Sequence, residues 1–190
     1  MRVAVFGGTF DPPHVGHENI VAKLIDRFDK VIIVPSKVTP NKENQPMASS
    51  SQRMKMLSLC SFSNNSNCMI SSYEIDSNKS PSYTIDTIRH IKNKFKTSEI
   101  HVAIGLDQLN NLNSWHKWDC LKSIVKFICF NRFSKKINKK CLVDCEFIND
   151  FDYNISSSDI RRLVLAETQN FKGLINDNVF NYIINESLYK

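Results

Sequence analysis

The chain has 190 residues, of which 42% are hydrophobic, and this length accommodates one globular domain with a substantial core. Its formal net charge of +6 and pI near 9.0 favour anionic ligands, but the excess is mild and spread along the chain, so small anions suffice and nucleic acid is not required. The six cysteines form no C-x-x-C pair, no apolar run could cross a bilayer, and the first residues indicate a strand and not a signal peptide. We therefore expect a cytoplasmic protein that contacts no membrane.

Strand and helix patterns alternate along the chain. Short apolar runs predict strands at Arg2–Phe6, Lys30–Pro35, Cys68–Tyr73, Ile100–Gly105, Ile124–Phe130 and Val143–Ile148. Apolar residues at three-to-four spacing, with their caps, predict helices at Gly16–Phe28, Ser51–Phe62, Tyr83–Phe95, Trp118–Lys122, Ser157–Ala166 and Asn178–Asn185. This alternation predicts an α/β fold, a single Rossmann-like domain over residues 1–190, with a mostly parallel sheet and helices on both faces. In such folds ligands bind beyond the carboxyl ends of the strands.

The segment from Gly7 to His17 joins the first predicted strand to the first predicted helix. Gly7 and Gly8 permit close approaches that let main-chain N–H groups face an anion, and a helix beginning near His14 adds unpaired donors. His14 and His17 project to the same side of the first turn, and Gly16 between them leaves room for a ligand. The segment is neither a dinucleotide fingerprint nor a P-loop, and no zinc partners lie nearby, so it predicts a phosphate site.

A second segment, Ile155 to Arg161, opens a later helix. Ser156 followed three residues on by Asp159 resembles a capping box, and Arg161 stands one turn in, where its planar fork can hold triphosphate oxygens. Taken alone, this pattern favours an ordinary helix cap with a solvated arginine, because caps are common. Because the Gly7–His17 segment is also present, the phosphate-binding interpretation of Ile155–Arg161 becomes the preferred one.

Together the two segments resemble a known superfamily. Gly7–His17 matches the G-G-T-F-D-P-x-H-x-G-H signature of the nucleotidylyltransferases, in the form seen in bacterial nicotinate mononucleotide adenylyltransferases, and Ile155–Arg161 resembles their I-S-S-T-x-I-R signature. Pro81–Thr87 resembles the P-S-Y-T-x-D-T-L segment of the latter family, and Gly105–Trp118 resembles its G-x-D…L…W-x-x-W segment. The similarity spans nearly the whole chain.

This resemblance implies transfer of AMP from ATP to nicotinate mononucleotide, giving nicotinate adenine dinucleotide and pyrophosphate. It implies Mg²⁺ bound mainly through the ATP phosphates, with no metal site on the protein. The implied catalytic residues are His14, His17 and Arg161. The implied ATP-binding residues are Gly7, Gly8, Thr9, Phe10, Gly16, Gly105, Asp107, Ser156, Ser157 and Ser158. The implied acceptor-binding residues are Asn41, Lys42, Tyr83, Thr84 and Trp115, the last stacking on the pyridine ring, while Trp118 is expected to pack in the core.

Some positions depart from the family pattern or allow other interpretations. Asn41 stands where relatives usually have His, and Leu106 stands where a small Ala is common, which is expected to crowd the sugar side of the pocket. Asp107 fits a ribose contact or a helix N-cap. Nicotinamide mononucleotide, phosphopantetheine or another phosphomonoester is the alternative acceptor. A noncatalytic nucleotide-binding module would be expected to lack the histidines, and nucleic-acid binding would predict steep salt dependence. The sequence does not indicate an oligomeric state.

Overall fold

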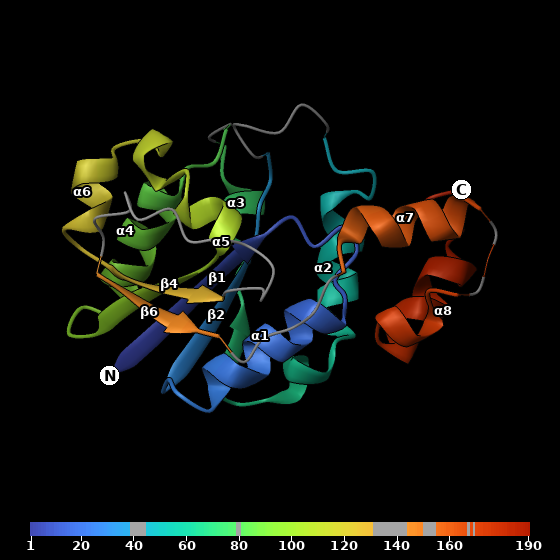
Figure 1. Cartoon of the computed structure of the whole chain (residues 1–190), viewed down its shortest axis with the longest axis horizontal. Helices are drawn as coiled ribbons and strands as arrows, with labels where there is room; N and C mark the ends of the chain where they lie inside the picture. Colours follow the sequence, from blue (N-terminus) through green and yellow to red (C-terminus); the bar gives the residue numbers. More distant parts are fainter. Residues whose placement is uncertain (39–44, 79–80, 131–143, 150–154, 167, 169) are drawn as a thin grey trace.

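A six-stranded parallel sheet forms the centre of the protein (Figure 1). The computed structural model describes residues 1–38, 45–78, 81–130, 144–149, 155–166, 168 and 170–190. The strands are β1 (Arg2–Gly8), β2 (Lys30–Pro35), β3 (Cys68–Ile70), β4 (Glu99–Gly105), β5 (Lys126–Phe130) and β6 (Cys145–Ile148), in the order β3-β2-β1-β4-β5-β6. This confirms the predicted α/β class and the Rossmann-like sheet.

The helices occupy the stretches between the strands and after the last one. They are α1 (Val15–Ile25), α2 (Ser50–Ser58), α3 (Tyr73–Asp76), α4 (Thr84–Lys94), α5 (Leu106–Leu109), α6 (Trp118–Lys122), α7 (Ser157–Leu165) and α8 (Asp177–Asn185), with 3₁₀ turns η1 (Ser61–Asn64), η2 (Leu112–Ser114) and η3 (Lys172–Leu174). In Figure 1, α4 and α6 lie at one end of the long axis, and α7 and α8 lie at the other, beyond α2. None of the helices in the described part of the chain is long and apolar enough to span a membrane.

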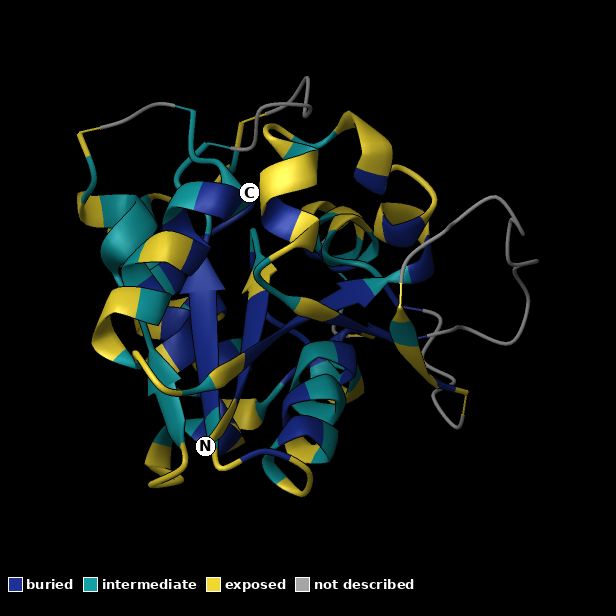
Figure 2. Ribbon diagram, turned by 90° about the vertical axis from the view of Figure 1, so that its left-hand side faces the viewer, coloured by how far each residue is buried: buried dark blue, intermediate teal, exposed yellow. Residues whose placement is uncertain are grey.

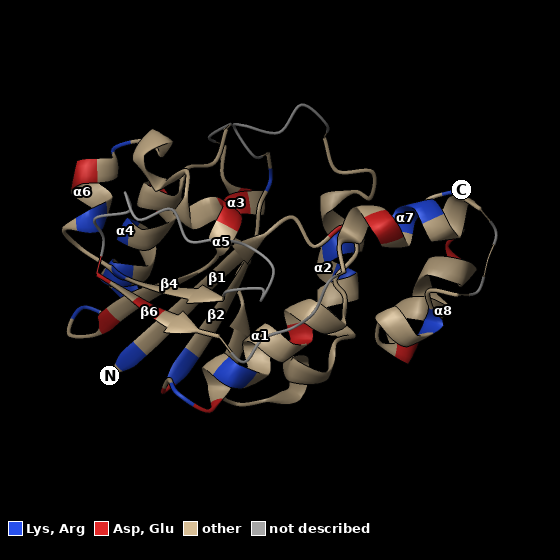
Figure 3. Ribbon diagram, in the orientation of Figure 1, with Lys and Arg blue, Asp and Glu red and all other residues tan. Residues whose placement is uncertain are grey.

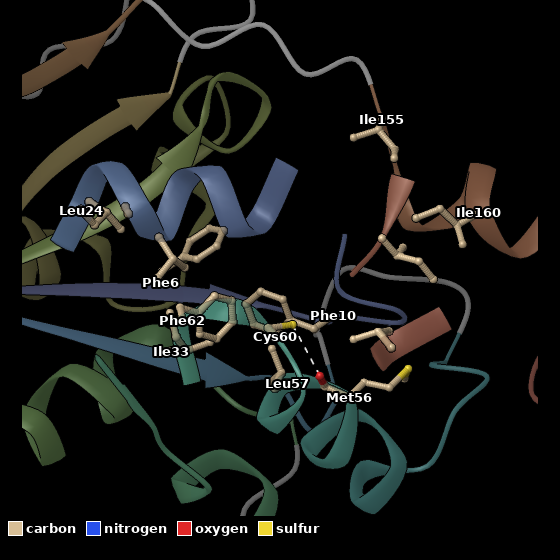
Figure 4. Close-up of a cluster of buried hydrophobic side chains, with 14 of the residues drawn as sticks. Phe6, Phe10, Leu24, Ile33, Met56, Leu57, Cys60, Phe62, Ile155 and Ile160 are labelled. Atoms are coloured by element: carbon tan, nitrogen blue, oxygen red, sulfur yellow. Dashed lines mark hydrogen bonds between the residues drawn. The ribbon is translucent and has the colours of Figure 1, made fainter. Parts of the chain in front are cut away.

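Alternate residues of each strand pack on opposite sides of the sheet, as the period of two requires. Val3 and Val5 of β1 pack with the Ile88 side of α4, whereas Ala4 and Phe6 pack with α1, α2, α7 and α8. Because both faces are covered, the central strands are buried along most of their length (Figure 2). Figure 4 shows the core on the Ala4 and Phe6 side of the sheet. There Phe6 and Phe10 lie beside Met56 and Leu57 of α2 and near Ile160 of α7.

Several predicted boundaries were wrong. Gly7 and Gly8 belong to β1, since they continue its parallel pairing opposite Val34 and Pro35. The strand predicted to reach Tyr73 ends at Ile70, and Tyr73 begins α3 instead. The helix predicted over Ser51–Phe62 ends at Ser58, because Cys60 takes an extended conformation before η1. Val143, predicted to begin the last strand, lies outside the described residues.

The chain leaves β1 toward β2 on one side, and β4 lies on the other side. The connections therefore diverge at the carboxyl ends of β1 and β4, which is where open parallel sheets bind ligands. The segment after β1 and the start of α5 both lie at this point.

Candidate active site

A cavity of about 990 Å³ opens at the carboxyl ends of β1, β2 and β4. Its wall joins two groups of residues that are far apart in the sequence. One group comprises Gly7, Gly8 and Thr9 at the end of β1, with Asp107 and Gln108 of α5. The other comprises Ser82, Tyr83 and Thr84 at the start of α4, with Trp115 and His116. The cavity thus connects the predicted phosphate loop with the predicted acceptor residues.

The two glycines at the end of β1 differ in their surroundings. A Cβ on Gly8 would lie 2.9 Å from the Phe10 ring, whereas the nearest atom to a Cβ on Gly7 is the Val34 carbonyl oxygen at 3.9 Å. Phe10 was predicted to contact ATP, but its side chain is 1% exposed and belongs to the core. Its ring packs edge-on against His17 with centroids 4.9 Å apart, so the side chain supports the site from beneath.

The aromatic end of the cavity is built on α4 and the turn before α6. Tyr83 occupies the N-cap position of α4 without a side-chain capping bond, and its ring stacks on His116 at a centroid distance of 4.1 Å. Thr84 is the first residue of α4, where backbone N–H groups lack helical partners and can receive a carboxylate. Trp115 is half-buried and lines the cavity, while Trp118 packs against Phe127, as predicted. Asn41 and Lys42 lie outside the described residues.

His14 and His17 form a stacked pair, with ring centroids 3.7 Å apart and planes 29° from parallel. The backbone N–H of His14 donates to Nδ1 of His17 at 3.2 Å. Nδ1 is therefore an acceptor, and a neutral His17 carries its proton on Nε2. In that tautomer Nε2–H is the donor of the ring.

Gly16 was predicted to leave room for a ligand, and the structure contradicts that. A Cβ at Gly16 would lie 3.0 Å from Nδ1 of His14 and 3.3 Å from Ile155. The missing side chain accommodates the His14 ring and the start of the second motif. Gly16 therefore shapes the histidine pair.

The second motif attaches directly to the first. The Ser157 hydroxyl donates to the Pro12 carbonyl at 2.8 Å, and Arg161 Nη1 donates to the Asp11 carbonyl at 2.6 Å. Nη2 of Arg161 donates to the Ser158 hydroxyl oxygen at 3.1 Å. The two motifs therefore meet. His14, His17, Arg161 and the three serines are not among the residues that line the cavity.

The cap of α7 differs in detail from the predicted capping box. The Ser156 hydroxyl oxygen accepts from the Asp159 backbone N–H at 3.1 Å, as expected. The Asp159 carboxylate accepts from the Ser156 hydroxyl at 2.5 Å instead of reaching the backbone of Ser156. The same carboxylate pairs with Arg162, and the serine bond comes first among the causes that lower its pKa. Asp159 thus fixes the start of the helix that carries Arg161.

Two predictions about the segment after β4 were wrong. Leu106 is 3% exposed and packs in the core, so it does not crowd the sugar side of the cavity. The N-cap of α5 is Gly105, and Asp107 lies in the first turn, which removes the N-cap alternative for Asp107. Asp107 is exposed and lines the cavity, consistent with a contact to ribose hydroxyls.

Sequence reasoning missed a buried polar network beneath the first motif. Arg53 of α2 is 1% exposed and donates to the carbonyl oxygens of Thr9 and Ser36, both at 2.8 Å. Burial lowers its pKa, and the negative charge of Asp11 opposes that shift. Asp11 is 2% exposed and accepts from the Tyr189 hydroxyl at 2.8 Å. The sequence signal for this network is Arg53, a charged residue on the same side of α2 as the apolar Met56 and Leu57.

A second missed residue, Glu74 of α3, lines the cavity. It accepts from the Thr87 hydroxyl at 2.6 Å, and burial raises its pKa against the opposing effect of that bond. Among the described residues, no three His, Cys, Asp or Glu side chains gather closely enough to hold a metal ion.

The parallel sheet, the loop at its switch point and the adjoining aromatic pocket define an α/β nucleotidyltransferase. The chain belongs to the cytidylyltransferase-like family, whose model matches residues 5–163. It is 34% identical over 197 residues to a probable nicotinate-nucleotide adenylyltransferase of Fusobacterium nucleatum subsp. nucleatum, covering 98% of both chains. It is also 34% identical over 190 residues to the protein of that name from Shouchella clausii, covering 99% of this chain and 96% of the relative.

The fold is shared with solved structures. A Plasmodium falciparum nicotinic acid mononucleotide adenylyltransferase complexed with NaAD superposes with a TM-score of 0.82 at 22% identity, over 99% of this chain and 97% of the other. The same protein complexed with APC superposes with a TM-score of 0.80 at 21% identity, over 99% and 96%.

Proposed function

We propose that this enzyme transfers AMP from ATP to the 5′-phosphate of nicotinate mononucleotide, forming nicotinate adenine dinucleotide and pyrophosphate. The observation that supports this proposal most strongly is that one cavity is lined both by the Gly7–Thr9 segment and by Trp115 with the start of α4. The full-length similarity to nicotinate-nucleotide adenylyltransferases supports the same reaction.

The chemistry is a direct displacement at the α-phosphorus of ATP. An oxygen of the acceptor phosphate forms the new P–O bond, and the bond between the α-phosphorus and its bridging oxygen to the β-phosphorus breaks. That bridging oxygen leaves with the electron pair as part of pyrophosphate. The acceptor phosphate is already ionised at neutral pH, so no general base is required. Catalysis then consists of alignment and stabilisation of the charge that develops on the phosphates.

The residues beside the first motif supply that stabilisation. Nε2–H of His17 donates to the α-phosphate, because Nδ1 is occupied by the His14 amide. Arg161 and the serines at the start of α7 hold the leaving pyrophosphate. His14 stacks on His17 and fixes its plane. Asp107 accepts from the ribose hydroxyls of the adenosine.

The aromatic end of the cavity selects the acceptor. Trp115 stacks on the pyridine ring, and N–H groups at the start of α4, around Thr84, receive the ring carboxylate. Asn41 and Lys42 are proposed to contact the mononucleotide phosphate.

The phosphate oxygens of ATP would supply most of the ligands of a Mg²⁺ ion, with few ligands from the protein. When bound, the ion offsets the negative charge of the triphosphate.

The test is a pyrophosphate-release assay with ATP, Mg²⁺ and either nicotinate or nicotinamide mononucleotide. We expect faster turnover with nicotinate mononucleotide, whose carboxylate matches the N–H groups of α4. Release with neither compound, or a clear preference for the amide, would contradict the proposed acceptor. Phosphopantetheine, which has no pyridine ring, is the control acceptor in the same assay.

A further inference from the structure

The carboxylate of Asp11 is divided between two sets of partners. Oδ1 accepts from the Tyr189 hydroxyl at 2.8 Å and from the Ala48 backbone N–H at 3.1 Å. Oδ2 accepts from the Met47 backbone N–H at 2.8 Å and lies 3.7 Å from Nη1 of Arg161. The orientation of this carboxylate therefore decides which oxygen the guanidinium of Arg161 meets.

Tyr189 lies outside both motifs and reaches Asp11 from the segment after α8. Its side chain is buried, and its backbone has a φ of 66°, which turns the chain back toward the core. Burial and the neighbouring Asp11 carboxylate both raise its pKa, so the hydroxyl keeps its proton and remains a donor. A tyrosine held this way contributes one directed hydrogen bond to a carboxylate that contacts the catalytic arginine.

Besides the Asp11 carboxylate, Arg161 has two hydrogen-bond partners among the described residues. Nη1 donates to the Asp11 main-chain carbonyl at 2.6 Å, and Nη2 donates to the exposed Ser158 at 3.1 Å. Its side chain is 25% exposed, so solvent competes for the guanidinium wherever protein partners do not hold it. Asp11 is therefore its main buried anchor.

We propose that Tyr189 is a positioning residue for Arg161, which acts by holding Oδ1 of Asp11 so that Oδ2 faces the guanidinium. In this role Tyr189 touches neither ATP nor the acceptor. It fixes the conformation in which Arg161 meets the triphosphate. The inference rests on the role given to Arg161 in the proposed function, and it can be tested on ATP alone, without an acceptor.

The test measures MgATP binding by titration calorimetry for the wild type, Tyr189→Phe, Arg161→Gln and the double variant. Loss of one hydrogen bond to a charged group is expected to weaken ATP binding roughly three- to tenfold in Tyr189→Phe. Arg161→Gln is expected to weaken it more. The double variant should bind ATP within about twofold of Arg161→Gln, because Tyr189 has no effect once the guanidinium is gone.

Controls separate positioning from folding. Tyr182→Phe removes a hydroxyl from the neighbouring half-buried tyrosine of α8 and should bind ATP like the wild type. Misfolded protein would lower the calorimetric stoichiometry and leave the dissociation constant of the folded fraction unchanged. Binding of nicotinate mononucleotide to Tyr189→Phe should also remain unchanged.

Two results would overturn the inference: wild-type ATP affinity in Tyr189→Phe, or losses that simply multiply in the double variant. Failure of the wild type to release pyrophosphate with nicotinate mononucleotide, with ATP binding intact, would overturn only the proposed acceptor. Absence of ATP binding to the wild type would overturn both.

Discussion

The backbone N–H of His14 donates to Nδ1 of His17, at 3.2 Å, and this bond fixes which nitrogen of His17 carries the proton. In the proposed mechanism the ring therefore presents Nε2–H to the phosphates. Replacement of His17 by Ala is expected to lower turnover about a hundredfold or more, as for other donors to transition-state oxyanions.

Amide substitutions refine that expectation. The amide N–H₂ of Gln reaches the position of Nε2, whereas the shorter Asn reaches that of Nδ1. Turnover by His17→Gln should therefore exceed turnover by His17→Asn in the pyrophosphate-release assay. Equal activities, or a fully active His17→Ala with an unchanged melting temperature, would remove His17 from the mechanism.

The two glycines of β1 should respond differently to alanine. Gly8→Ala forces the new Cβ against the Phe10 ring at 2.9 Å, and such overpacking is expected to destabilise the protein by about 1–3 kcal/mol. Gly7→Ala has open space, with nothing nearer than 3.9 Å, and should stay within about 0.5 kcal/mol of the wild type. Because Gly7 lines the cavity, its alanine variant should weaken ATP binding instead. Urea denaturation and ATP titration of the pair check this, and equal stability losses would contradict it.

Arg53 stabilises the loop that follows β1. Arg53→Met leaves the carbonyl oxygens of Thr9 and Ser36 without their buried donor and the charge of Asp11 less compensated. We expect a loss of about 3 kcal/mol in the free energy of unfolding, measured by urea denaturation. Lys55→Met, a change at an exposed position of the same helix, is the matched control and should be nearly neutral. A stable Arg53→Met protein would show that the buried cation is dispensable.

Trp115 and Trp118 should separate acceptor binding from folding. Trp115→Ala removes the ring that lines the cavity and is expected to raise KM for nicotinate mononucleotide roughly tenfold, with KM for ATP unchanged. Trp118→Ala removes packing on Phe127 and should lower the melting temperature with little change in either KM. Steady-state kinetics with each substrate varied in turn distinguishes the two. A shift in KM for ATP in Trp115→Ala would contradict its placement.

The free energy of unfolding should depend on pH through the protonation of Glu74. Burial raises its folded-state pKa above the ordinary value of 4.5, so the folded protein binds this proton more tightly than the unfolded chain. The resulting contribution to stability is complete below pH 4.5 and is lost as the pH rises through the raised pKa. Glu74→Gln keeps an acceptor for Thr87 and should lose less stability over that interval.

The control for Glu74 is Asp76→Asn, an exposed change at the end of the same short helix. Its unfolding free energy should follow the wild-type dependence on pH. Parallel profiles for Glu74→Gln and the wild type would show that Glu74 does not titrate in this way.

Basic side chains lie on several elements of the molecule. Figure 3 shows basic residues on α1, α4 and α7, toward both ends of the long axis. This agrees with the expectation that the mild positive charge is spread along the chain.

Local patterns predicted the sheet and most helices because strand hydrophobicity and helix period are encoded within a few residues. The bounds of α6 were predicted as observed. The two motifs carried the prediction of a phosphate site, and the structure shows that Ser157 of the second contacts Pro12 of the first. Short helices such as α5 were missed because four residues carry too little periodicity to stand out.

The support beneath the site was not predictable in the same way. Arg53, Asp11 and Tyr189 come from three distant stretches, and only the folded chain shows that their polar atoms satisfy one another. Gly16 was misinterpreted for the same reason, since the atoms that occupy the space against it belong to the His14 ring and to Ile155. A sequence window reveals an absent side chain but not what fills the gap.

The bonds from Ser157 to Pro12, from Arg161 to Asp11 and from Tyr189 to Asp11 close chain loops of 145, 150 and 178 residues. Closing loops this long is entropically unfavourable until the strands between their ends have already assembled. During refolding, tryptophan fluorescence should therefore recover before the ability to bind nucleotide. We therefore expect the contacts of Ser157, Arg161 and Tyr189 to form last, so that a partly folded chain would have Trp115 and the start of α4 in place before Arg161 reaches the loop after β1.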